Sequence, residues 1–117
     1  MKETFVLIHQ GPDPAPEILT LDPADLLRGM YTAIGCDCIE IVHVPTGLLL
    51  PEGVVMVVDE SFWFRASVRV NKFGSLWYGD TIMGNVILAA EGNRDGEPDL
   101  VGLSDYQLAF LRSCFGI

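Results

Sequence analysis

Short apolar runs separated by turn-forming residues recur along the chain and predict a β-sheet. Residues 4–9 (TFVLIH) form the first run, and a turn with two prolines at residues 11–14 (GPDP) closes it. Residues 17–21 (EILTL) alternate between apolar and polar side chains, which is typical of a half-buried strand. The two runs are therefore predicted to pair as a β-hairpin.

Two segments carry helical spacing with capping signals at their ends. Asp22 is a suitable N-cap, Pro23 fits the first helical position, and Gly35 supplies the stop. Ser104 caps a second helix at residues 105–114. The apolar positions of the first helix are Leu26, Leu27, Met30, Ala33 and Ile34, and those of the second are Leu108, Phe110, Leu111 and Phe115.

Three more runs complete the predicted sheet. Residues 38–44 (CIEIVHV) show no purely polar face and predict a central strand. Residues 54–59 (VVMVVD) are too apolar for an edge, and residues 80–90 form a further strand in which Gly84 indicates a bulge or a close backbone approach. Turns are expected at residues 45–47 and 51–53, and a polar loop at residues 92–99.

This order of elements predicts the α+β class. Strands lie before, between and after the helices without regular βαβ alternation. We therefore expect a largely antiparallel sheet of about five strands with two helices, one after Asp22 and one after Ser104. The length of 117 residues fits a single compact domain covering residues 1–117.

The charge balance narrows the classes of partner. Sixteen acids against seven bases give a net charge of −9, which argues against binding to nucleic acid or to an anionic membrane. The apolar runs are too short to span a bilayer, and the first residues lack a signal-peptide pattern. We therefore expect a cytoplasmic protein.

The residues that carry catalytic chemistry are sparse. The three cysteines include a Cys36-Asp37-Cys38 pair without the spacing of a zinc or redox motif, and we expect reduced, buried thiols. His9 and His43 have no nucleophile motif beside them, and His43 is expected to be a satisfied sheet residue. Asp59-Glu60 is a weak candidate for a cation site or a base. We therefore predict no enzyme activity, no metal and no cofactor.

One segment departs from the acidic composition of the rest. Residues 61–79 contain no acid, three of the seven bases and six of the eleven aromatic residues. Removing these three cations from the net charge of −9 leaves −12 for the remainder. An aromatic, cationic neighbourhood on an acidic body is the composition that an anionic ligand with a flat ring requires.

This segment supplies the candidate ligand-binding residues, which are Arg65, Arg69, Asn71, Trp77 and Tyr78. Two other interpretations stay open. The aromatic residues can be core, with Phe62, Phe64 and Phe73 packed and the cations paired with Asp59, Glu60 or Asp80. The segment can also be a subunit interface, because Trp, Tyr and Arg are enriched at such surfaces.

The chain resembles DUF3846, a domain-of-unknown-function family of small phage and mobile-element proteins. The residues that carry the resemblance are, in order, the capped helix of residues 22–35, Cys38-Ile39-Glu40-Ile41-Val42, Val57-Val58-Asp59-Glu60, Asn71, Asp80-x-Ile82-x-Gly84-x-Val86-Ile87 and Leu103-Ser104-Asp105. The chain departs from the family pattern at Ser61-Phe62-Trp63-Phe64 and at Arg69-Val70-Asn71, both inside the unusual segment. The resemblance implies an accessory protein that counters a host defence, and it transfers no activity.

Two hypotheses of function follow. In the first, the protein is a sponge that sequesters a nucleotide-derived immune signal in a pocket built from the five candidate residues, and it forms a homo-oligomer that shares the pocket between subunits. In the second, the protein is an acidic decoy that mimics DNA and inhibits a host DNA-handling protein. Carboxylates such as Asp95, Glu97 and Asp99 would then stand at phosphate-like spacing.

Overall fold

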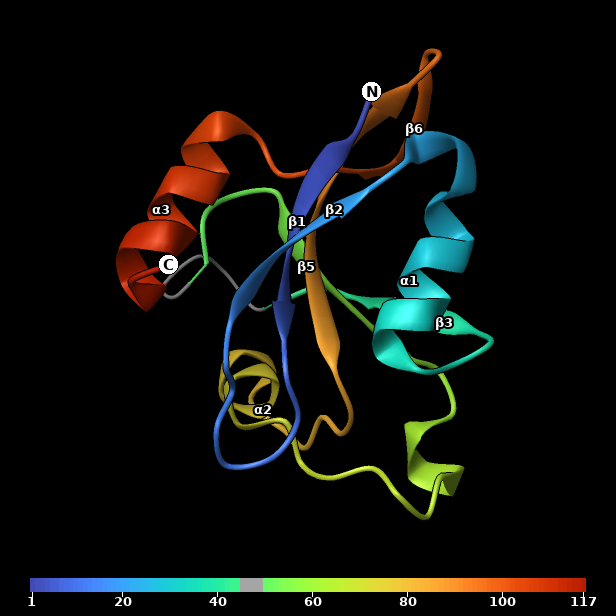
Figure 1. Ribbon diagram of the computed structural model, residues 1–117, viewed down its shortest axis with the longest axis vertical. Helices are drawn as coiled ribbons and strands as arrows, with labels where there is room; N and C mark the ends of the chain where they lie inside the picture. Colours follow the sequence, from blue (N-terminus) through green and yellow to red (C-terminus); the bar gives the residue numbers. More distant parts are fainter. Residues whose placement is uncertain (45–49) are drawn as a thin grey trace.

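A computed structural model describes residues 1–44 and 50–117, and its centre is an antiparallel sheet of six strands (Figure 1). The spatial order is β2-β1-β5-β4-β3, and β6 pairs with β5. The strands are β1 (Glu3–Ile8), β2 (Glu17–Leu21), β3 (Ile39–Val42), β4 (Val54–Asp59), β5 (Val86–Arg94) and β6 (Glu97–Val101). The predicted α+β class and the predicted β1–β2 hairpin are confirmed.

Three helices pack on the sheet, one more than predicted. They are α1 (Leu26–Ile34), α2 (Lys72–Tyr78) and α3 (Asp105–Phe115), and short 3₁₀ turns occupy Pro23–Asp25 and Phe62–Phe64. Ser104 caps α3, as predicted, whereas Asp22 caps the 3₁₀ turn that leads into α1 and not α1 itself. Gly35 ends α1 with a φ of 85°, a left-handed conformation that glycine adopts without strain.

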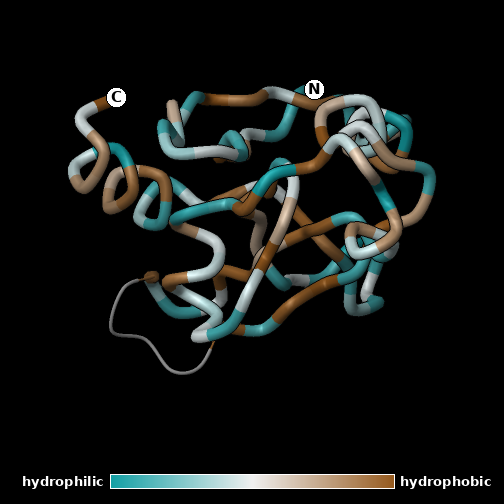
Figure 2. The backbone as a smooth tube through the Cα atoms, turned by 90° about the horizontal axis from the view of Figure 1, so that it is seen from below, coloured by the Kyte–Doolittle hydropathy of each residue, from teal (hydrophilic) through white to brown (hydrophobic). Residues whose placement is uncertain are grey.

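The helices lie on both faces of the sheet, so two apolar cores form (Figure 1). Successive side chains of β1 alternate between them, since a strand points its side chains to opposite faces in turn. Phe5 and Leu7 join the core beneath α1, whereas Val6 and Ile8 join the core beneath α2 and α3. Figure 2 shows the hydrophobic backbone segments crossing the middle of the molecule.

Two strand predictions were wrong in position. Residues 38–44 were expected in the centre, but β3 is an edge strand in which Ile41 is 41% exposed. Its residues are half-buried or exposed, as at the edge of a sheet. β5 begins at Val86 and not at residue 80, because Gly84 takes a φ of 86° and the chain before it turns to meet Val70.

The predicted polar loop of residues 92–99 is a hairpin between β5 and β6. Asp95 and Gly96 both have positive φ, at 53° and 81°, which is the two-residue turn that matches the twist of paired strands. Arg94 at the end of β5 donates two hydrogen bonds to Glu3 of β1, at 2.9 and 3.0 Å. These bonds hold the pKa of the Glu3 carboxyl below its ordinary value and tie the hairpin to the first strand.

The predicted turn at residues 45–47 lies outside the described residues. Among the helices of the described chain, none is long and apolar enough to cross a bilayer.

Candidate functional site

Asn71 is completely buried and has a structural role. Its side-chain amide donates hydrogen bonds to the carbonyl oxygens of Ile8 at 3.1 Å and Gly84 at 2.9 Å. Its side-chain oxygen accepts a hydrogen bond from the Gly74 N–H at 2.8 Å and so caps α2. All of its polar groups are therefore engaged within the protein, and none is directed to a ligand.

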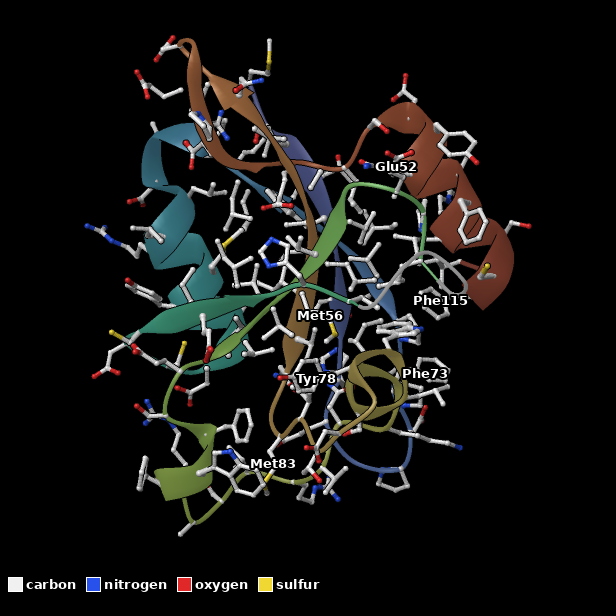
Figure 3. The ribbon with its side chains drawn as sticks, turned by 180° about the vertical axis from the view of Figure 1, so that it is seen from behind. Glu52, Met56, Phe73, Tyr78, Met83 and Phe115 are labelled. Atoms are coloured by element: carbon white, nitrogen blue, oxygen red, sulfur yellow. The ribbon has the colours of Figure 1, made fainter. Side chains whose placement is uncertain are left out.

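The two aromatic candidates, Trp77 and Tyr78, have opposite environments. Trp77 is buried against Phe73, with ring centroids 5.5 Å apart, and against Phe115, at 6.0 Å. Phe73 and Phe115 also stack on each other and join α2 to α3 (Figure 3). Tyr78 is the last residue of α2 and is 41% exposed. Trp77 thus belongs to the core, and Tyr78 remains available at the surface.

The two arginine candidates contact different parts of the molecule. Arg65 donates hydrogen bonds to Asp59 and to Asp37. Arg69 is exposed, and its guanidinium group lies against the backbone of Gly11, where a Cβ atom would meet Nη2 at 2.8 Å. The surface hollow that Arg65 borders, between the end of α1 and Asp37, includes none of the other four candidates. The structure therefore does not gather the five predicted residues around that hollow.

The two most exposed aromatic residues of the segment lie instead on the turn after β4. We call residues 59–65 the aromatic turn. Phe62 points inward and is 8% exposed, whereas Trp63 is 65% and Phe64 is 89% exposed. The expectation that Phe64 is packed was wrong. Two adjacent aromatic side chains in water are unusual for a monomer surface and are typical of an interaction site.

The carboxylate of Asp59 fixes the aromatic turn. It is buried at the end of β4 and accepts hydrogen bonds from the Ser61 N–H, at 2.9 Å, and from the Arg65 guanidinium. The bond to Asp59, together with the charge of Asp37, raises the pKa of the Arg65 guanidinium above its ordinary value. The turn is thus closed at both ends by a single buried side chain.

The sequence contains a signal for this exposure that composition alone does not reveal. Phe62, Trp63 and Phe64 are consecutive and form a 3₁₀ turn, in which residues point about 120° apart. Three large side chains in such a turn cannot all face the core. Phe62 fills the core position, so its two neighbours are exposed.

The cysteines and His43, other residues with potential chemical reactivity, do not form a common site. Cys36 is half-buried, while Cys38 and Cys114 are exposed, so the prediction of buried thiols was wrong for these two. A hydrogen bond to Glu60 raises the pKa of the Cys38 thiol. His43 is exposed and lies 2.8 Å from the carboxylate of Glu91. Over residues 1–44 and 50–117, no group of three or more potential ligands is placed to hold a metal ion.

Comparison with known proteins gave one match. The model of a family described as "Domain of unknown function (DUF3846)" matches residues 1–116, which is nearly the whole chain. No curated protein and no solved structure matches the chain.

Proposed function

The chain belongs to the family DUF3846, and we propose that it is a non-catalytic accessory protein that binds a basic host protein through its aromatic turn. The family resemblance implies a phage or mobile-element setting. An inhibitor of a host protein fits this setting, because inhibition requires binding and no catalysis. The observation that carries the proposal is the pair of exposed aromatic side chains, Trp63 and Phe64, on a turn that Asp59 holds in place.

Rigid presentation makes this pair suitable for binding. Trp residues dominate the energetics of protein interfaces because they bury a large apolar area and lose few rotamers. The hydrogen bonds from Ser61 and Arg65 to Asp59 fix the backbone before a partner arrives. Less conformational entropy is then lost on association, which favours affinity.

The charge around the turn indicates the sign of the partner. Asp37, Asp59 and Glu60 outnumber Arg65, and the protein as a whole has a net charge of −9. An acidic surface repels nucleic acid and attracts proteins that carry clustered Lys and Arg. Proteins that handle DNA have such surfaces, because they neutralise phosphates. This supports the decoy hypothesis, with the aromatic pair as the specific anchor.

The nucleotide sponge remains the second hypothesis and now has less support. A small-molecule site is a concave pocket whose lining side chains are free to contact the ligand. Asn71 and Trp77 are buried within the protein, and Arg65 is paired with the carboxylates of Asp59 and Asp37. Arg69 and Tyr78 remain exposed and could contact a nucleotide. A panel of cyclic and ADP-ribose-type nucleotides at millimolar concentration tests this hypothesis, because a ligand that binds the folded state raises the melting temperature.

Affinity capture from nuclease-treated host lysate, quantified by mass spectrometry, tests the proposed function. We expect the wild-type protein to enrich one or a few basic proteins, and the Trp63→Ala and Phe64→Ala variants to lose at least ten-fold of that enrichment. Nuclease treatment ensures that the captured proteins are not bridged by nucleic acid.

Tyr106→Ala is the matched control, since Tyr106 is 72% exposed and lies on α3, outside the aromatic turn. This variant should retain the enrichment. Equal capture by all four proteins, or capture that persists undiminished in high salt, would contradict the proposal.

A further inference from the structure

The face of the sheet beneath α1 is incompletely covered. Five strands at about 4.8 Å spacing extend roughly 20 Å or more across, whereas one helix with its side chains covers about 10–12 Å. α1 has only nine residues and is the one helix assigned to this face in the described chain. Apolar hollows therefore remain on both sides of it.

The hollow on the β3 side has a volume of about 410 Å³. Its apolar lining combines Leu27 of α1, Ile39 and Ile41 of β3, and Pro98 and Leu100 of β6. Leu27 is 54% and Ile41 is 41% exposed, which is high for aliphatic side chains that face a sheet surface. The hollow is large enough to receive apolar side chains of another molecule.

The backbone of β3 next to this hollow is directed outward. The N–H of Glu60 donates a hydrogen bond to the carbonyl oxygen of Cys38 at 3.1 Å, so Cys38 and Glu60 form a hydrogen-bonded pair. Hydrogen-bonded and non-hydrogen-bonded pairs alternate along an antiparallel ladder. Ile39 and Ile41, opposite Asp59 and Val57, are therefore in the non-hydrogen-bonded positions.

The consequence is that Ile39 and Ile41 each direct their N–H and C=O groups away from β4, toward the outer edge of the sheet. Within residues 1–44 and 50–117, no further strand pairs with β3 at that edge. The same two residues thus offer backbone hydrogen bonds at the edge and apolar side chains to the hollow. This combination is the requirement for a peptide that adds a strand to a sheet.

The groups around the hollow are predominantly acidic. Glu91 lies beside His43. Arg94 forms ion pairs with both Asp99 and Glu3, so these three residues together carry one net negative charge. Glu40 is exposed on the opposite face of β3, and Asp37 precedes the strand. A peptide at this edge therefore meets a negative field on both sides, and positive flanking residues complement it.

We propose that the outer edge of β3 and the adjoining hollow bind an extended segment of a basic partner protein, which places an aliphatic side chain between Leu27 and Ile41. That the partner is a basic protein rests on the proposed function. The two surfaces are neighbours, since Asp37, two residues before β3, is bonded to Arg65 of the aromatic turn. One partner can contact both.

A peptide titration followed by NMR of the ¹⁵N-labelled protein tests the proposal without the natural partner. The probe is a short peptide with a central leucine between valines and lysines at both ends. We expect chemical-shift changes at the amides of β3, and at least ten-fold weaker binding when the central leucine is replaced by proline, which removes a backbone donor and blocks strand pairing. A peptide with glutamates in place of the lysines should bind at least ten-fold more weakly.

Ile41→Asp and Leu27→Asp should each weaken binding of the lysine peptide at least ten-fold. Ile18→Asp is a matched control, because Ile18 is also 41% exposed and lies on β2, the opposite edge strand. It should change the affinity less than two-fold. The melting temperature of each variant verifies that it is folded.

Three results would overturn the proposal: equal weakening by the Ile18 and Ile41 variants, shift changes confined to other elements, or a homodimer that Ile41→Asp converts to monomer in light scattering. The last result would make a second copy of the chain the occupant of the edge. Trp63→Ala should leave the peptide affinity unchanged, so failure at the β3 edge is distinguishable from failure of the aromatic turn.

Discussion

A single asparagine joins three parts of the chain that are distant in sequence. The side chain of Asn71 contacts the end of β1 through Ile8, the start of α2 through Gly74, and the turn before β5 through Gly84. The backbone N–H of Asn71 also donates a hydrogen bond to Ile82 at 2.8 Å. A buried amide with every donor and acceptor used specifies one arrangement of its neighbours.

Replacing Asn71 by alanine should therefore destabilise the protein strongly. The substitution leaves two buried carbonyl groups and one buried N–H without their partner, so we expect a loss of about 3 kcal/mol in the free energy of unfolding, measured by urea denaturation. Asn93→Ala, at an exposed position of β5, should change the stability by less than about 0.5 kcal/mol. Similar midpoints for the two variants would show that the three hydrogen bonds contribute little.

Among the elements, α3 has the most complete set of terminal signals. Ser104 accepts a hydrogen bond from the Gln107 N–H at 3.2 Å, and the Gln107 side chain accepts one from the Ser104 N–H at 2.8 Å. Gln107 also donates to the Glu52 carbonyl oxygen at 2.9 Å. This reciprocal pair satisfies backbone donors that the first turn of a helix leaves free.

Ser104→Ala should cost about 1 kcal/mol in the free energy of unfolding, because the N-cap acceptor is lost. The same substitution at Ser113, an exposed position inside α3, serves as the control. There alanine has the higher helix propensity, and the stability should stay equal or rise slightly. Equal loss at both positions in thermal and urea unfolding would contradict the role of the cap.

The elements with strong local signals were predictable, and the others were not. The caps at Asp22 and Ser104 and the apolar run of β4 are local features. α2 was not predicted because its seven residues are too few to display helical periodicity. The edge position of β3 depends on which strands pair, and hydropathy cannot reveal this when apolar residues such as Ile41 remain exposed.

The candidate site was predictable as a segment but not residue by residue. The charge and aromatic content of residues 61–79 singled out a stretch that includes the exposed Trp63 and Phe64. Composition cannot say which aromatic residue is buried, and here Trp77 completes the core while Trp63 is exposed. The pairing of a cation with Asp59 was one of the open interpretations, and Arg65 confirms it. The contact of Arg65 with Asp37 was not foreseen, because Asp37 lies 28 residues away in sequence and only the tertiary fold brings the two together.

At the scale of the whole molecule, unbalanced charge opposes folding. The described ion pairs engage Arg28, Arg65 and Arg94, and most carboxylates on this chain of net charge −9 lie exposed. Mutual repulsion among them destabilises the compact state, and salt screens it with a Debye length of about 10 Å at 0.1 M ionic strength. The melting temperature should thus rise by about 3 °C between low salt and 0.5 M NaCl.

Reversing charges separates screening from a general effect of salt on hydration. Glu40→Lys with Glu52→Lys changes two exposed acids to bases, so the net charge falls in magnitude from −9 to −5. This variant should melt higher than the wild type at low salt and gain less from added NaCl, and the corresponding double glutamine variant should lie between them. Differential scanning fluorimetry over a salt series measures all three proteins. An identical gain in each would assign the salt effect to hydration of the apolar surface and not to the repulsion between carboxylates.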